Sequence, residues 1–150
     1  MKIYLCSQKN YFAVSNDTSR AEIRHFFSSQ VKEVKKSPNS INTMDVFPDL
    51  GVHCFYDKEN KLLAMEIFSP NKFSIEEQNY LNWIGKTNDE IINYLKKINF
   101  ISLNNIEVDD LGIKLLNYPI STVVNEKQET ECCYLDFSDS KTNFYISKQA

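Results

Sequence analysis

Glycine is scarce in this chain, with three among 150 residues. Loops that cradle phosphate groups use several glycines at fixed spacings, because the backbone has to approach the phosphate closely. The chain has neither G-x-G-x-x-G nor G-x-x-x-x-G-K-[ST]. Gly85-Lys86-Thr87 matches the end of the second motif, but the position of its first glycine is Tyr80. Both kinds of nucleotide-binding loop are therefore excluded.

Histidine and cysteine are also few, with two and four residues. No C-x-x-C pair and no H-E-x-x-H motif is present, which excludes zinc fingers, zinc ribbons and the common zinc proteases. Cys132 and Cys133 are adjacent, and neighbours on a strand point to opposite faces, so they are not expected to form a disulfide. The sequence predicts free thiols in a reducing compartment, with no metal site and no cofactor.

Long hydrophobic runs are absent. A transmembrane helix needs roughly 20 consecutive apolar residues, and no segment approaches that length. The N-terminal residues MKIYLCSQKNYF lack the apolar region and the cleavage site of a signal peptide. Apolar residues make up 42% and charged residues 25% of the chain, which is usual for globular proteins. We therefore expect a cytoplasmic protein that folds as a single domain over residues 1–150.

Two helices are predicted from their N-terminal signals. Ser19 and Glu22 have the spacing of a capping box, and apolar residues follow on one stripe as far as Val34, before the turn residues 37–40. Thr87 and Glu90 repeat this spacing before a second apolar stripe that ends near residue 98. Residues 74–83 fit either an irregular loop or a short helix.

The strands form the other part of the expected fold. Alternation predicts a hairpin with arms at residues 52–56 and 62–68, joined by the turn Asp57-Lys58-Glu59-Asn60. Further strands are expected at Lys2–Cys6, Ile113–Tyr118, Ile120–Asn125 and Thr130–Ser138. The predicted fold is α+β, with one mostly antiparallel sheet of about five to six strands and two main helices packed on one face.

An approximate internal repeat runs through these elements. The helix start at residues 19–23 matches residues 87–91, and DLGV at residues 49–52 matches DLGI at residues 110–113. A duplicated helix-plus-hairpin unit is one interpretation, with the glycine of each DLG segment at a position where no Cβ fits. Coincidence is the other interpretation, because such short matches are common.

His53 and Cys54 form the sharpest catalytic candidate. A cysteine nucleophile needs a base within hydrogen-bonding reach, but neighbours on a strand point to opposite faces, so these two residues cannot serve each other. Cys54 is instead expected to be a small buried residue. An enzyme with an active site around His53 or Cys54 remains an alternative.

The capped helix, the hairpin DLGVHCFYDKENKLLAMEIF, the segment WIGKTNDEIINYLKK and the strand DLGIKLLNY together resemble small immunity proteins of bacterial polymorphic toxin systems, including contact-dependent growth inhibition. The resemblance covers residues 18–137. It implies a cytoplasmic protein that binds one cognate toxin domain, often a nuclease, and blocks its active site or its access to substrate. No functional residue is implied by the resemblance.

Charge indicates where such a partner would bind. Residues 101–140 carry eight acidic and two basic side chains, although the whole chain has a net charge of only −3. An acidic segment repels nucleic acid and attracts a basic protein surface; a solvated face without any partner is the alternative. The expected contact residues are Glu107, Asp109, Asp110, Glu129, Glu131 and Asp136. A phage or mobile-element protein with another binding role is a further alternative.

Overall fold

The computed structural model describes residues 1–5, 11–100, 105–138 and 142–148. Within these residues the chain forms two α-helices and twelve β-strands, which lie in two mostly antiparallel sheets. The predicted α+β class with two helices is confirmed. The prediction of one sheet with five to six strands is wrong: eight of the strands have three or four residues, which is too short for a recognisable alternation.

The larger sheet has eight strands, and every strand is antiparallel to its neighbours. The predicted hairpin is confirmed and lies near the middle of this sheet. In spatial order the strands are β3 (Lys32–Val34), β4 (Met44–Phe47), β5 (Val52–Tyr56), β6 (Leu62–Phe68), β11 (Thr130–Asp136), β10 (Ile120–Val124), β9 (Gly112–Leu115) and β8 (Ile106–Asp109).

The smaller sheet joins both ends of the chain to its middle. Its strands are β2 (Phe12–Val14), β12 (Phe144–Ser147), β1 (Lys2–Tyr4) and β7 (Lys72–Ser74), in that spatial order. β1 pairs antiparallel with β12 and parallel with β7. The predicted first strand is therefore confirmed over Lys2–Tyr4, whereas Cys6 lies outside the described residues.

Helix α1 (Arg20–Phe27) begins at the predicted cap. Ser19 accepts a hydrogen bond from the Glu22 amide, and the Glu22 carboxylate accepts one from the Ser19 amide. The helix ends at Ser28, which has a left-handed φ of 46°. The predicted apolar stripe as far as Val34 is therefore wrong at its end, because β3 begins at Lys32 and β-branched valine suits a strand as well as a helix stripe.

Helix α2 (Asn88–Lys97) is confirmed, with Thr87 as its cap. The preceding residues 75–86 contain no helix or strand, so the ambiguous segment 74–83 holds no helix: Ser74 ends β7 and residues 75–83 form a loop. Trp83 anchors this loop: its side chain is fully buried and its ring contacts Phe73 edge-on at 5.2 Å.

The two halves of the chain have the same order of elements. α1, β4, β5 and β6 begin at residues 20, 44, 52 and 62, and α2, β9, β10 and β11 begin 68 residues later, at 88, 112, 120 and 130. The loops between these strands therefore have equal lengths. Even the strand irregularities correspond, since one falls between residues 55 and 56 and the other between residues 123 and 124.

The turns of the two halves share their hydrogen bonds. The Asp57 carboxylate accepts bonds from the amides of residues 59 and 61, and the side-chain oxygen of Asn125 accepts bonds from those of residues 127 and 129. Asn60 and Gln128 both have left-handed φ angles, of 59° and 62°. The match of the two helix starts in the sequence therefore corresponds to a match in structure.

The match between the two DLG segments has a different structural meaning. Gly51 lies between β4 and β5, whereas Gly112 starts β9 after β8, so the two glycines occupy different turns. The space around each is nevertheless as expected: a Cβ would lie 2.6 Å from the Phe68 carbonyl oxygen at Gly51 and 2.0 Å from the Thr122 carbonyl oxygen at Gly112. Each position excludes a side chain, but the two are not equivalents in the repeat.

The pairing of β6 with β11 relates the halves by a local twofold axis. Met65 pairs with Leu135, and Ile67 pairs with Cys133. In the repeat Met65 corresponds to Cys133 and Ile67 to Leu135, so exchanging the two halves turns one pair into the other. Glu66 pairs with Tyr134, which is the residue that corresponds to Glu66 in the second half. The axis therefore passes through the Glu66–Tyr134 pair, as in an isologous contact between two subunits.

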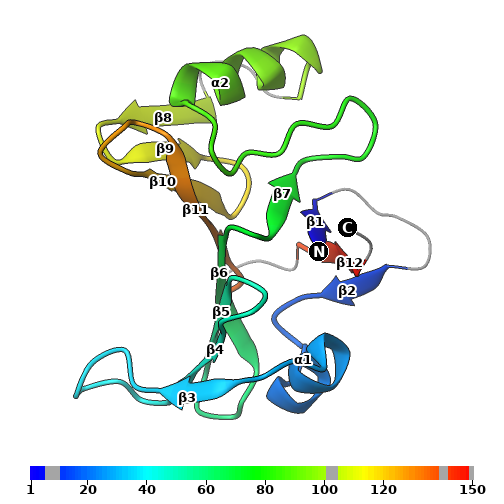
Figure 1. Ribbon diagram of the computed structural model, residues 1–150, viewed down its shortest axis with the longest axis vertical. Helices are drawn as coiled ribbons and strands as arrows, with labels where there is room; N and C mark the ends of the chain where they lie inside the picture. Colours follow the sequence, from blue (N-terminus) through cyan, green and yellow to red (C-terminus); the bar gives the residue numbers. More distant parts are fainter. Residues whose placement is uncertain (6–10, 101–104, 139–141, 149–150) are drawn as a thin grey trace.

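One face of the larger sheet forms the core. On β5 the side chains of Val52, Cys54 and Tyr56 are buried, while those of His53 and Phe55 are half-buried on the other face. In Figure 1 α1 and the smaller sheet lie to the right of the middle strands, and α2 lies over the upper end. The hydrophobic cluster contains residues from both helices, both sheets and both halves of the chain.

Candidate binding face of the eight-stranded sheet

In the described part of the chain, no helix or strand covers the second face of the larger sheet (Figure 1). Strand register places one row of side chains across this face, from Val46 through His53, Glu66, Tyr134 and Ser121 to Lys114. We call the whole set the uncovered face; it comprises Val46, His53, Phe55, Glu66, Phe68, Lys114, Ser121, Val123, Cys132, Tyr134 and Asp136.

His53 and Cys54 lie on opposite faces, as predicted. The Cys54 side chain is fully buried in the core, and this burial raises the pKa of its thiol far above the ordinary value. His53 belongs to the uncovered face, where its Nδ1 lies 3.3 Å from Glu66 Oε1 and its ring contacts Phe68 at 4.9 Å. The two side chains cannot form a nucleophile and base pair.

Cys132 is the thiol that lies on the same face as His53, which sequence reasoning did not identify. It pairs with Phe68 across the β6–β11 ladder. Burial, together with the nearby carboxylates of Glu66 and Glu131, raises the pKa of Cys132 to about 12. The thiol is therefore protonated at neutral pH and is a poor nucleophile.

Four of the six predicted acidic residues lie at two neighbouring turns. Asp109 and Asp110 lie at the β8–β9 turn, and Glu129 and Glu131 lie at the start of β11. These two turns are side by side, since the Val124 amide donates to the Leu111 carbonyl at 2.9 Å. We call this group, together with Glu126, the acidic end: Asp109, Asp110, Glu126, Glu129 and Glu131.

The other two predicted residues lie elsewhere. Glu107 is exposed on the edge strand β8, opposite Lys114. Asp136 is half-buried at the far end of β11, where its amide donates to the Pro119 carbonyl. Across the described ranges, none of the ion pairs within 4.0 Å involves Glu107, Asp136 or the acidic end.

A depression with a volume of about 500 Å³ opens on the uncovered face beside Asp136. The β9–β10 loop, residues 116–119, forms one wall. Polar groups in the lining include Lys114, Ser121, Tyr134 and Asp136.

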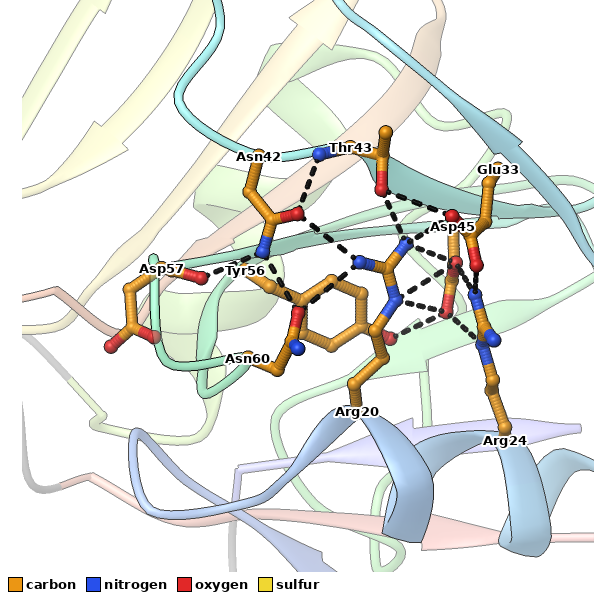
Figure 2. A network of polar contacts seen from close by, with 9 residues as sticks. All are labelled: Arg20, Arg24, Glu33, Asn42, Thr43, Asp45, Tyr56, Asp57 and Asn60. Atoms are coloured by element: carbon orange, nitrogen blue, oxygen red, sulfur yellow. Dashed lines mark hydrogen bonds and ion pairs between the residues drawn. The ribbon is translucent and has the colours of Figure 1, made fainter.

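A second polar cluster lies between α1 and β4, and Figure 2 shows the side chains of Arg20, Arg24 and Tyr56 pointing toward Asp45. The Asp45 side chain is fully buried. Its carboxylate accepts hydrogen bonds from Arg20 at 2.6 Å, from Arg24 at 2.6 and 2.8 Å, and from the Tyr56 hydroxyl at 3.1 Å. Arg24 also donates to Glu33 at 2.6 Å, and Arg20 donates to Thr43 at 2.9 Å.

These contacts make the cluster a structural clamp. Burial alone would raise the pKa of Asp45, but the hydrogen bonds and charges of Arg24 and Arg20 outweigh burial and hold that pKa below its ordinary value. Both guanidinium groups are thereby occupied by carboxylates of the chain itself. The second half has Asn88 and Ile92 at the corresponding helix positions, so the ion pairs belong to the first half alone.

The described residues offer neither a metal site nor a membrane-spanning helix. They contain no group of three or more His, Cys, Asp or Glu side chains placed to hold a metal ion. Among the same residues there is no helix of the length and apolarity needed to cross a membrane.

The chain was also compared with known proteins. Protein-family models, curated proteins and solved structures all give no match. The geometry of the uncovered face and of the acidic end is therefore what any assignment of function has to rest on.

Proposed function

We propose that this chain is an immunity protein: it binds a cognate bacterial toxin domain through the acidic end and the adjoining uncovered face, and thereby blocks the active site of the toxin or its access to substrate. The observation that carries the proposal is the adjacency of a sheet face without a covering layer and five acidic side chains at one end of it. A nuclease is a fitting target, because its substrate-binding surface is basic.

Charge supports a basic partner. Asp109, Asp110 and Glu131 are exposed, and the acids of this end have no ion-pair partner among the residues the structure describes. Surface carboxylates without an ion-pair partner stay hydrated and are free to attract a cation. Complementary charge between two proteins mainly increases their rate of association. The acidic end would therefore steer the toxin toward the uncovered face.

The uncovered face supplies apolar contacts next to that charge. Val123 is 44% exposed and the Phe68 ring is half-buried on the same side of the sheet, and both residues pair with Cys132, which follows Glu131. Interfaces commonly combine apolar and aromatic anchors with a charged rim, and the anchors contribute most of the binding energy. The arrangement suits a protein surface better than a small substrate, because the face is broad and the three thiols of the described residues, Cys54, Cys132 and Cys133, are buried.

The proposal is tested by co-expression with a cognate toxin domain, which we expect to be the C-terminal domain of a large secreted protein encoded next to this chain. Growth arrest by that domain should be relieved, and the two proteins should co-purify. The double variant Asp110→Lys/Glu131→Lys should bind at least about 10-fold more weakly, because it reverses charge at the centre of the acidic end.

The matched control is Glu59→Lys, which reverses an exposed acid in the corresponding turn of the first half. It should protect cells as the wild type does. Unrelieved growth arrest, or equal loss of protection in the control, would contradict the proposal.

A further inference from the structure

The depression on the second half of the uncovered face exists because the two halves differ at a few corresponding positions. In the first half the His53 ring contacts Phe68 at 4.9 Å and bonds to Glu66 at 3.3 Å. The residues 68 positions later are Ser121, Asp136 and Tyr134, in that order. A large ring pair is thus replaced by a small hydroxyl and a carboxylate, which leaves open space between the β9–β10 loop and β11.

The lining of this space suits a cation. The Asp136 carboxylate uses Oδ1 to accept bonds from the Ser138 amide at 2.9 Å and the Ser138 hydroxyl at 2.6 Å. Within the described part of the chain no hydrogen bond reaches its Oδ2. Tyr118 and Tyr134 line the same space, and Tyr118 is held against Phe100 with ring centroids 4.8 Å apart. Phenol rings and a carboxylate together attract guanidinium and ammonium groups.

The electrostatics agree with this chemistry. The pKa of Tyr134 is raised first by burial and then by the carboxylates of Asp136 and Glu66, which indicates a negative field at the phenol. Lys114 also lines the depression and carries the opposite charge. Its amine is exposed and free to turn into solvent, so it weakens the attraction for a cation without cancelling it.

We propose that this depression binds one cationic side chain, arginine or lysine, that the protein partner inserts from its basic surface. The identity of the donor rests on the proposed function; the affinity of the depression for a guanidinium group does not, and can be measured on this chain alone. Asp136 would accept the guanidinium hydrogen bonds through Oδ2, and the tyrosine rings would contact its faces. Of the predicted acidic residues, Asp136 is thus an anchor, whereas the acidic end provides steering.

The test is titration of the full chain with Nα-acetyl-arginine methylamide, followed by amide NMR shifts. The shifts should concentrate on Ser121, Tyr134 and Asp136. The isosteric neutral probe, Nα-acetyl-citrulline methylamide, should bind at least about 5-fold more weakly, because it lacks the charge.

Four variants test which residues of the depression bind the arginine probe. Asp136→Asn should weaken arginine binding at least about 5-fold, and Ser121→His, which restores the first-half residue, should abolish it by filling the space. Lys114→Ala should strengthen binding about 2-fold, because it removes a like charge. Asp110→Asn, at the distant acidic end, should leave binding unchanged, and all four should keep the wild-type thermal midpoint within a few degrees.

Four results would contradict binding of a cation in the depression. Equal binding of the citrulline probe, an unchanged affinity in Asp136→Asn, shifts confined to the acidic end, or no shifts at all would overturn the inference. None of these results would bear on whether the toxin domain itself is neutralised, so failure of the depression and failure of the proposed function are distinguishable.

Discussion

At the scale of single residues, Asp45 decides how firmly α1 is attached to the sheet. Its buried carboxylate is shared by two arginines and a tyrosine hydroxyl. Removing one partner of a buried ion pair leaves uncompensated charge, which typically costs 3–5 kcal/mol. Because Arg24 is 33% exposed, we expect Asp45→Asn to lower the free energy of unfolding by about 3 kcal/mol, at the low end of that range.

Urea denaturation at neutral pH measures this cost. Glu33→Gln is the matched control, since the Glu33 side chain is 52% exposed and a surface pair contributes at most about 1 kcal/mol. Equal destabilisation by the two variants would show that Asp45 is no more important than a surface ion pair.

The pH dependence of stability has a definite sign at Asp45. Its pKa is lower in the folded chain than in the unfolded chain, where a value of about 3.9 applies. The stabilisation is therefore present above about pH 4 and is lost as the pH falls through the folded value. Asp45→Asn should flatten the loss of stability in acid; a variant as acid-sensitive as the wild type would contradict this assignment.

Cys132 gives a second prediction for a single residue. Since its pKa is raised to about 12, alkylation by iodoacetamide at pH 8 should be at least about 100-fold slower than for an unhindered thiol of pKa near 8.5. The rate should increase with pH up to the limit of folding, as measured by mass spectrometry of the Cys132 peptide. Rapid alkylation of Cys132 in the native chain at pH 8 would contradict a buried, protonated thiol.

At the scale of elements, the two helix caps form a matched pair. Ser19 and Thr87 each accept a hydrogen bond from the amide three residues on, and each forms a bridge to the residue before a central strand. Replacing either by alanine removes this bond, so Ser19→Ala and Thr87→Ala should each cost about 1 kcal/mol in chemical denaturation. A cost at only one of the two sites would contradict their structural equivalence.

Elements with a local signal were predictable from the sequence. The helix caps, the hairpin at residues 52–68 and the strands at Ile120–Val124 and Thr130–Asp136 carry a cap or an alternation that one segment can reveal. The short strands β2, β3, β4, β7, β8 and β12 carry none, because pairing partners far along the chain define them. The same holds for the Asp45 clamp, in which Arg20 and Asp45 are 25 positions apart.

The repeat was partly visible for a physical reason. The cap of a helix needs particular side chains, so residues 19–23 and 87–91 resemble each other in both sequence and structure. Strand positions need only burial or exposure, so counterparts such as His53 and Ser121 have diverged. The DLG match, in contrast, reflects a shared requirement for a tight backbone approach at two different turns.

The proposed contact residues were indicated by charge, but their arrangement was not evident from the sequence. The excess of acids between residues 101 and 140 was evident from composition. Only strand order shows that Asp109 and Glu131 lie at the same end of the sheet while Asp136 lies at the other. The depression was not predictable, because its existence depends on the contrast between Phe68 and Asp136 in a three-dimensional repeat.

At the scale of the whole molecule, the β6–β11 pairing and the common hydrophobic cluster connect both halves. We therefore expect one cooperative unfolding transition. Fluorescence of Trp83, the single tryptophan, and far-UV circular dichroism should give coincident urea curves. Separate midpoints for the two signals would show that the halves unfold independently.

The proposal that this chain neutralises a basic toxin domain is tested by the salt dependence of association. The rate constant for binding the proposed toxin domain should fall at least about 10-fold between 0.05 M and 0.5 M salt, because charge steers the encounter. In Asp110→Lys/Glu131→Lys the rate should be slow at low salt and nearly independent of salt. A wild-type rate that does not change with salt, or a double variant as fast as the wild type at low salt, would contradict the claim.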